Sequence, residues 1–564
     1  MTFKDFEYTR PEMDQLISSA DTIIDQFSAA GSVVEQNELI AKLNVLRNDF
    51  DTMWNIAQIR HTIDTTDKFY EAENSFYDQN LPLFQSIVSK FYKALVGSTF
   101  RKELEGEWGE QFFKIAEMTT RTFDESIIEH LKTENSLVSK YVKLLSSANI
   151  EFMDKEYNLS GLVPFMQNQD REIRKGSSNA YWSFFAENKD KLDELFGQLV
   201  KIRSEIADKL GFNNFVELGY LRMLRSDYNS EDVKRFRGLV KKHIVPITAQ
   251  LKKRQTNRLG LDSLKYYDNG INFSNGNAKP KGDPEWILAH GRKMYEELSP
   301  ETAEFFEFMV EKQLLDLVNK KGKAGGGYCT YLPNQKAPFI FSNFNGTSHD
   351  IDVLTHEAGH AFQVYQSRNF EIPEYNWPTY EACEIHSMSM EFLTWPWMDR
   401  FFEDEVDKYR FTHLSGGLNF LPYGVSVDEF QHFVYENPEA TPAERNAAWS
   451  AIEAKYLPHL DYDGNEFLEG GGFWQKQAHI FESPFYYIDY TLAQICAFQF
   501  WKRSQDDRKS ALADYMRLCA AGGSKSFLQL VDYANLESPF EEAAFNKVVG
   551  SVEQYLEAVD DTAL

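Results

Sequence analysis

The chain has 564 residues, and its 86 aspartates and glutamates outnumber its 59 lysines and arginines, which gives a net charge of −27 at pH 7. A surface this acidic repels phosphate backbones and anionic lipids, so we expect neither a nucleic-acid nor a membrane partner. No apolar run approaches the ~18 residues of a membrane-spanning helix, and the first residues lack the pattern of a secretory signal.

The four cysteines are far apart in the sequence and form no CxxC pair. In a chain of this size they are typical of reduced, buried thiols, so we expect a cytoplasmic protein. The sequence carries no signal for the oligomeric state.

Helical periodicity dominates the chain. Residues 10 to about 165 carry long amphipathic patterns with few glycines or prolines, which predict a series of helices. The polar segment 267–286 predicts a long loop, and Asp283-Pro284 within it marks a helix start. Near the C-terminus, Ser538 is predicted to cap a helix that begins at the following proline and continues to about 559.

The only convincing strands lie in the middle of the chain. Residues 328–332 ("YCTYL") and 338–344 ("PFIFSNF") are separated by a short turn and predict a hairpin. The long polar loop and a glycine-rich segment at 321–327 precede the region 328–468, and a second glycine-rich segment at 469–472 follows it. Loops of this kind are often functional, and the alternative is surface decoration.

The segment 351–365, "IDVLTHEAGHAFQVY", holds two histidines four residues apart with a glutamate between them. In a helix, His356 and His360 lie about one turn apart on one face, so both imidazoles can reach one ion. Glu357 projects beside them and is the only Asp, Glu, Lys or Arg from 353 to 366, which indicates a buried helix. A buried carboxylate is costly unless a metal-bound water relieves that cost. The spacing therefore predicts a metal site.

The third ligand decides the class of metal site. A metzincin has a glycine and a third histidine three and six residues after the second histidine, and both positions hold glutamine here. Residues 379–395 ("TYEACEIHSMSMEFLTW") predict a second helix, which can present Glu384 to the two histidines if the helices are antiparallel. This His2Glu set leaves a fourth position open, as in catalytic zinc sites, although cobalt or manganese also suits it. The alternative for Glu384 is a solvated helix carboxylate.

Two further glutamates of the second helix are candidates to orient the histidines. Ligating histidines usually donate their other N–H to a carboxylate or a carbonyl oxygen. Glu381 and Glu391 are the residues that the pattern offers, and Glu391 shares the face of Glu384.

Three separated motifs, "HDIDVLTHEAGHAF", "EIHSMSME" and "HIFESPFYYIDYTLA", resemble in order and spacing those of the thimet oligopeptidase and oligoendopeptidase F family of zinc metallopeptidases, including the Pz-peptidases. The resemblance implies a mainly α fold in which two lobes flank a deep substrate channel, with a small β-hairpin or sheet beside the HExxH helix. It implies an N-terminal helical lobe over 1–165 and a zinc metallopeptidase catalytic domain over 166–564. It also makes Glu384 the third ligand of one zinc ion per chain.

The expected reaction is hydrolysis of internal peptide bonds in short oligopeptides by a zinc-bound water that Glu357 activates. The resemblance assigns carbonyl-oxygen stabilisation to His479 and to spaced tyrosines, of which Tyr487 and Tyr490 share one helical face. The family places a further tyrosine nearer the histidine, where this sequence reads "FESP", so the separate roles of Tyr486 and Tyr487 stay open. Aromatic core packing is the alternative for each tyrosine.

The hairpin has two interpretations. Its second strand could pair with an extended peptide by β-augmentation, which recognises peptides without demanding a sequence. The alternative is that the hairpin only covers the helix that carries the two histidines.

Two other functions remain possible on the sequence. A zinc peptidyl-dipeptidase or carboxypeptidase uses the same HExxH and downstream glutamate, but it anchors a C-terminal carboxylate, for which the sequence shows no anchor. The other alternative is a catalytically silent helical peptide-binding scaffold. It is remote, because a site that had lost its activity would be expected to lack Glu357 or a metal ligand, and all of them are present.

Overall fold

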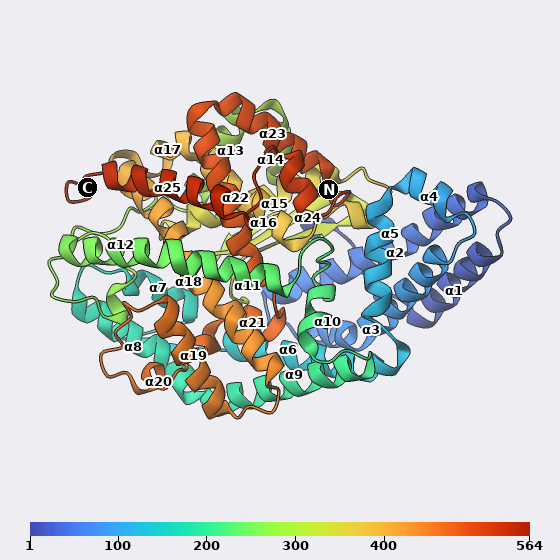
Figure 1. The fold of residues 1–564 in the computed structure, drawn as a ribbon, viewed down its shortest axis with the longest axis horizontal. Coiled ribbons are helices and arrows are strands. Elements are labelled where there is room, and N and C mark those ends of the chain that lie inside the picture. Colours follow the sequence, from blue (N-terminus) through green and yellow to red (C-terminus); the bar gives the residue numbers. More distant parts are fainter.

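The computed structural model covers residues 1–564 and consists mainly of helices, with two small sheets (Figure 1). The predicted mainly α fold class is therefore confirmed. None of the helices combines the length and the apolar character that a bilayer crossing requires.

The first five helices form a separate small core of 21 buried apolar residues, which also includes Ile372 and Tyr375 from a later segment. They are α1 (Met13–Ala29), α2 (Val33–Ile63), α3 (Lys68–Val96), α4 (Arg101–Trp108) and α5 (Glu110–Arg121). In Figure 1 this blue group projects from the rest of the molecule. The next helix, α6 (Ile128–Ser146), already packs into the larger core, and the lobe boundary at 165 stays a prediction.

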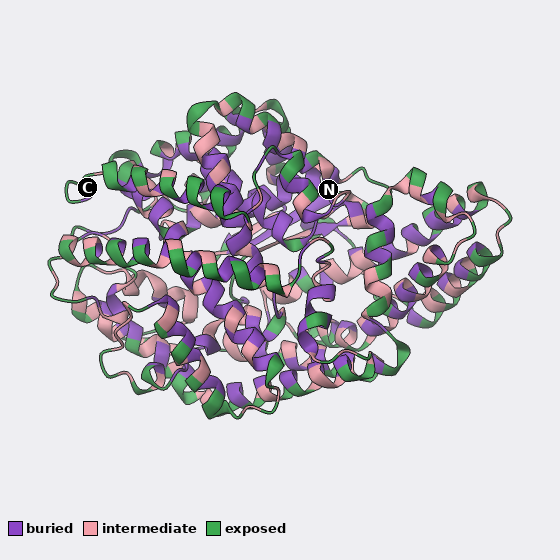
Figure 2. Ribbon diagram, in the orientation of Figure 1, coloured by how far each residue is buried: buried purple, intermediate pink, exposed green.

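The remaining helices surround one core of 104 buried residues, and buried positions concentrate in the middle of the molecule (Figure 2). Before the main sheet come α7 (Leu159–Met166), α8 (Arg171–Glu187), α9 (Lys189–Lys209), α10 (Phe215–Arg222), α11 (Ser230–Leu239), α12 (Val245–Arg258), α13 (Pro284–Leu298) and α14 (Pro300–Glu311). After it come α15 (His349–Ser367), α16 (Tyr380–Leu393), α17 (Asp399–Phe402), α18 (Val406–Glu436), α19 (Pro442–Tyr456), α20 (Glu466–Glu469), α21 (Ala478–Glu482), α22 (Tyr487–Asp506), α23 (Arg508–Ala521), α24 (Phe527–Tyr533) and α25 (Glu542–Ala558).

The main sheet has three strands in the order β3-β5-β4, namely β3 (Leu315–Val318), β4 (Tyr328–Leu332) and β5 (Ala337–Phe344). The predicted hairpin is confirmed, because β4 and β5 pair antiparallel. Strand β3 pairs parallel to β5 and was not predicted, since it is only four residues long and its register shifts between Asp316 and Val318. The sheet packs against α15, the helix that carries the two histidines.

Two local predictions need correction. A short hairpin of β1 (Ile150–Phe152) and β2 (Lys155–Tyr157) interrupts the region expected to be helical, because Met153 and Asp154 both adopt positive φ in a two-residue turn. Helix α25 begins at Glu542 rather than after Ser538, since Ser538 accepts the Glu541 N–H in a separate turn. The start of α13 is as predicted: the Asp283 side chain caps it by accepting the Trp286 N–H.

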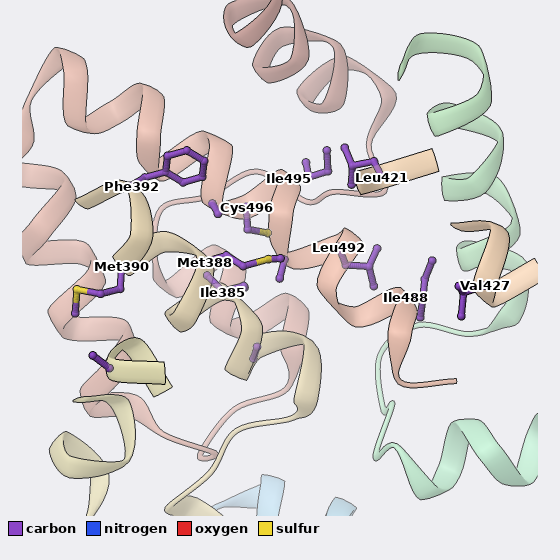
Figure 3. Packing of buried hydrophobic residues seen from close by; sticks show 14 of the residues in the cluster. Ile385, Met388, Met390, Phe392, Leu421, Val427, Ile488, Leu492, Ile495 and Cys496 are labelled. Carbon is purple, nitrogen blue, oxygen red and sulfur yellow. The ribbon is translucent and has the colours of Figure 1, made fainter. Parts of the chain in front are cut away.

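Helix α16 is the centre of the larger core. All of its residues except Tyr380 and Glu391 are buried, and it packs between α15 and α22. Figure 3 shows Ile385 and Met388 of α16 beside Cys496 of α22, with residues of α18 on the other side of α22. A helix enclosed on nearly all sides has little freedom to shift, so it is a rigid support for polar side chains that must keep their positions.

A buried arginine of α9 forms hydrogen bonds with residues of α6, α18 and α21. Arg203 of α9 donates to Glu134 Oε1 at 2.6 Å, to the Tyr435 hydroxyl at 3.0 Å and to the carbonyl oxygen of Phe481 at 2.6 Å. Arg222 of α10 donates to the other oxygen of Glu134 at 3.0 Å. Burial opposes the charged form of Glu134, but Arg222 and Arg203 outweigh it and lower its pKa to about 2.

Replacing Glu134 by glutamine is expected to lower the free energy of unfolding by about 3 kcal/mol, because the buried guanidinium group of Arg203 and the half-buried one of Arg222 lose their counter-charge. Since the folded pKa lies below the unfolded value, this contribution is present above about pH 4 and disappears as the pH falls toward about 2. Denaturant unfolding at several pH values measures both effects.

Glu129→Gln is the control on the same helix, because Glu129 pairs with Lys132 at the exposed surface. It should change the free energy of unfolding by no more than about 0.5 kcal/mol. Equal effects of the two substitutions would contradict the importance of the buried cluster.

Candidate metal centre and active site

Two helices bring the three predicted ligands together. His356 and His360 lie on α15, and Glu384 lies on α16. Glu384 Oε2 is 3.2 Å from His356 Nε2 and 3.3 Å from His360 Nε2. One ligand atom from each residue lies within 4.8 Å of the other two, which is close enough for one ion to contact all three.

The close approach of α15 and α16 depends on Gly359. A Cβ atom at this position would lie 2.6 Å from Ser387 Cα and 2.7 Å from the His386 carbonyl oxygen. Only glycine therefore lets the backbone between the two histidines touch the backbone of α16.

Glu391 orients the first histidine. Its Oε1 accepts from His356 Nδ1 at 2.7 Å and its Oε2 accepts from His413 Nε2 at 2.7 Å. The Trp395 indole N–H donates to His413 Nδ1 at 3.0 Å, which places the His413 proton on Nε2. Because His356 Nδ1 donates to Glu391, His356 Nε2 keeps its lone pair for a metal ion. His360 Nδ1 has no such partner.

Glu381, the other candidate to orient a histidine, does not contact either one. It is fully buried, and neither carboxylate oxygen has a hydrogen-bond partner. Burial, followed by the nearby Asp489 carboxylate, raises its pKa well above the ordinary value. The carboxyl group of Glu381 therefore favours its neutral form.

Glu384 is held as a charged carboxylate. The Ser387 hydroxyl donates to its Oε2 at 2.8 Å, and the Tyr486 hydroxyl donates to its Oε1. Burial opposes the charge, but His360 and His356 outweigh it and hold the pKa of Glu384 well below its usual range. The contact with Tyr486 was not predicted, because residues 102 positions apart in the sequence give no pairing signal.

Glu357 lies beside the ligands without a protein partner. It is 5% exposed, and its Oε2 has no hydrogen bond. Burial raises the pKa of Glu357 despite the neighbouring histidines. Gly327, at the end of the glycine-rich loop, faces this carboxylate, and a Cβ there would lie 3.1 Å from Glu357 Oε1. The carboxylate is therefore buried and available, as a group that moves protons must be.

His479 and the tyrosines converge from α21 and the start of α22. His479 Nε2 is 3.1 Å from the Tyr490 hydroxyl, and the His479 ring contacts Tyr487 edge-on at 5.0 Å between ring centroids. Tyr487 and Tyr490 share α22 as predicted, whereas His479 lies on the separate α21. Between them Phe485 has φ +70°, and buried Arg225 donates to its carbonyl oxygen and to Asp489.

The donor set and its surroundings fit a metal ion. Two imidazole nitrogens and one carboxylate oxygen converge, His356 Nε2 is directed by Glu391, and the buried Glu357 Oε2 lacks any protein partner. Nitrogen and oxygen donors in this number suit zinc with a position left open. Sequence reasoning missed His413 and Trp395, which support Glu391 from outside the three motifs.

Comparison with known families identifies the class of protein. Residues 3–123 match the Peptidase M3 N-terminal domain, and residues 164–549 match Peptidase family M3. The second match alone covers more than half of the chain, so the chain belongs to peptidase family M3. The predicted resemblance is therefore confirmed.

Solved structures and curated relatives agree with this family. The chain is 59% identical to Pz peptidase A, solved with an inhibitor, with a TM-score of 0.99 over 99% of this chain and 100% of that one. A Bacillus anthracis protein described as an oligoendopeptidase F is 56% identical, with a TM-score of 0.95 over 100% of this chain and 99% of that one. The oligoendopeptidase F homolog of Borreliella burgdorferi is 25% identical over 68% of this chain, and the match spans only 65% of that relative's length.

Substituting Gly359 by alanine is expected to separate α15 from α16 and to weaken metal binding at least ~10-fold, because the histidines then move away from Glu384. Metal content after dialysis against a graded chelator measures this, and circular dichroism checks the fold. Gly416→Ala is the matched control, since Gly416 is helical and a Cβ there meets nothing within 4 Å. Unchanged metal affinity in the Gly359 variant would show that the helix contact does not set the site.

Proposed function

We propose that the protein is a zinc-dependent endopeptidase that hydrolyses internal bonds of short oligopeptides. The observation that carries the proposal is the convergence of His356, His360 and Glu384 beside the buried, unpartnered carboxylate of Glu357. Membership of peptidase family M3 and the similarity to Pz peptidase A support the same activity.

The ligands would hold one zinc ion, which supplies a Lewis acid and acidifies a water when bound. Glu357 is the group that takes the proton of the attacking water and passes it to the leaving amine. The raised pKa of Glu357 suits the acceptance of the water's proton, because a carboxylate of very low pKa would accept it poorly. Glu391 keeps His356 in the tautomer that binds, and Tyr486 and Ser387 steady Glu384.

The carbonyl oxygen of the scissile bond becomes negatively charged during attack and needs donors. His479 and Tyr490, which contact each other at 3.1 Å, are proposed as these donors, with Tyr487 beside them. The contact of Tyr486 with Glu384 favours a role for Tyr486 at the metal ligand rather than at the oxyanion.

Oligopeptides are the proposed substrates, bound in a channel between two lobes. The expectation that the second hairpin strand pairs with a peptide needs correction, because β5 lies between β3 and β4 and has no free edge. A peptide could add only to an outer strand, and β4 is the outer strand that packs against α15 beside the candidate metal ligands. Division into lobes at residue 165, cytoplasmic location and the absence of nucleic-acid partners stay predictions. A zinc peptidyl-dipeptidase or carboxypeptidase is the second candidate.

Peptides amidated at the C-terminus are expected to be cleaved at internal bonds at rates within ~3-fold of the free acids, because an endopeptidase does not need the terminal carboxylate. Mass spectrometry of products from a mixed peptide library measures this, with a chelator as the control. Loss of cleavage on amidation would support the exopeptidase instead, and cleavage that survives complete metal removal would contradict the zinc mechanism.

Glu357→Gln is expected to keep zinc while kcat falls by about 10³-fold or more, since the near-isosteric amide cannot accept the proton. Zinc content and kcat are measured on the same preparation. A variant that loses its zinc would make Glu357 a structural residue and overturn the assignment of the base.

Tyr490→Phe is expected to lower kcat by roughly 10²–10³-fold with KM changed far less, because its hydrogen bond strengthens as charge grows on the carbonyl oxygen. Zinc content should stay at the wild-type level. Wild-type turnover, or a loss confined to KM, would return Tyr490 to the aromatic core.

A further inference from the structure

A chain of hydrogen bonds leads from α18 to the imidazole of His479. The Tyr423 hydroxyl donates to Gln477 Oε1 at 2.7 Å. Gln477 Nε2 lies 2.8 Å from His479 Nδ1, and His479 Nε2 lies 3.1 Å from the Tyr490 hydroxyl. Gln477 and Tyr423 are outside the motifs that the sequence singled out.

The location of the single proton on His479 matters because the ring is neutral. Burial lowers the pKa of His479 to about 4, although Glu384 opposes the shift. A neutral imidazole has one donor nitrogen and one acceptor nitrogen. Only the tautomer with the proton on Nε2 can donate toward Tyr490 and toward a substrate oxygen beside it.

The orientation of the Gln477 amide selects between the tautomers. Gln477 Oε1 is the only acceptor that the Tyr423 hydroxyl contacts, and the Gln477 NH2 group faces His479 Nδ1. The reverse orientation would turn the NH2 group, which only donates, to Tyr423 and leave the Tyr423 O–H without an acceptor. It would also place a carbonyl oxygen at Nδ1 and require the proton there. The ring of Tyr423 is itself held edge-on by Trp449, Phe473 and Tyr487.

We propose that Gln477 and Tyr423 are positioning residues that hold His479 as the Nε2–H tautomer, so that its N–H is ready for the oxyanion. This rests on the proposed function, in which His479 and Tyr490 stabilise that charge. Neither residue touches the reacting atoms, and both act through His479.

Two substitutions of Gln477 test the proposal. Gln477→Leu removes the donor to Nδ1, so both tautomers of His479 become populated. The kcat should fall about 10-fold, with KM changed less than ~2-fold. This decrease in kcat is smaller than the one expected when the oxyanion donor is removed altogether. Gln477→Glu offers Nδ1 an acceptor only. At low pH the His479 ring of this variant is charged and donates from both nitrogens. As the pH rises, the ring loses the Nε2 proton and keeps the Nδ1 proton, which the glutamate accepts. The kcat of Gln477→Glu relative to wild type should therefore fall at least ~10-fold as the pH rises.

The titratable groups that act on His479 or contact its chain of hydrogen bonds are Glu384, Tyr423, Tyr486, Tyr487 and Tyr490, and Lys476 lies over the Tyr423 ring. Of these, Lys476, whose pKa burial lowers to about 8, is the one that could titrate in the same interval. Lys476→Met combined with Gln477→Glu separates the two, since the pH dependence should persist in the double variant.

Tyr423→Phe should lower kcat about 3-fold, because the amide loses the contact that sets its orientation. Tyr462→Phe is the matched control: its hydroxyl also donates to a single partner, Glu453 Oε1 at 2.6 Å, in the same aromatic region without a link to His479. The control should keep wild-type kcat. Ring-nitrogen NMR of protein labelled in histidine reads the His479 tautomer directly.

Wild-type kcat in Gln477→Glu over pH 6–9, or an Nδ1–H signal for His479 in the wild type, would overturn the proposal. If Tyr490→Phe and His479→Ala also keep full turnover, the proposed oxyanion role has failed. If they lose turnover while the Gln477 variants do not, only the positioning role has failed.

Discussion

The backbone contact between α15 and α16 at Gly359 is the constraint on which the rest of the centre depends. It brings a carboxylate on one buried helix within 3.3 Å of two imidazoles on another. Once the backbones touch, the positions of the ligand atoms follow from helix geometry, since His356 and His360 lie one turn apart. Helix α16 is enclosed on almost every side because α22, α23 and α24 pack against it in addition to α15.

Enclosing α16 brings polar groups into the core, and each needs a partner or a neutral form. Glu391 is shared between two histidines, Glu384 accepts from Ser387 and Tyr486, and Asp489 is paired with Arg225. The arginines Arg203 and Arg225 also hold the carbonyl oxygens of Phe481 and Phe485, at both ends of the segment that links α21 to α22. This segment is therefore held at fixed points although Phe485 adopts positive φ.

The N-terminal helices also contribute to the centre. The segment between α15 and α16 inserts Tyr375 into their small core, where its hydroxyl accepts the Phe112 N–H and donates to the Trp108 carbonyl oxygen. The buried pair of Arg47 and Glu374 fastens the same segment to α2. The connection that joins the two helices with the candidate ligands is therefore packed against the N-terminal helices, which carry none of these residues.

The sequence by itself determined the local chemistry: helical periodicity, the turn that separates β4 from β5, the HExxH spacing of His356 and His360, and Glu384 on a following helix. These depend on residues a few positions apart, which the periods of helix and strand relate directly. The tertiary structure alone decided that Glu391 rather than Glu381 contacts His356, that Tyr486 contacts Glu384, and that Gln477 and Tyr423 lead to His479. The choice between Glu391 and Glu381 was set by the rotation of α16 within the core, and the other contacts by the packing of α16, α18, α21 and α22. Apart from Gln477 and His479, which are two positions apart, these contacts join residues 35 to 102 positions apart. No local pattern in the chain encodes contacts over such separations.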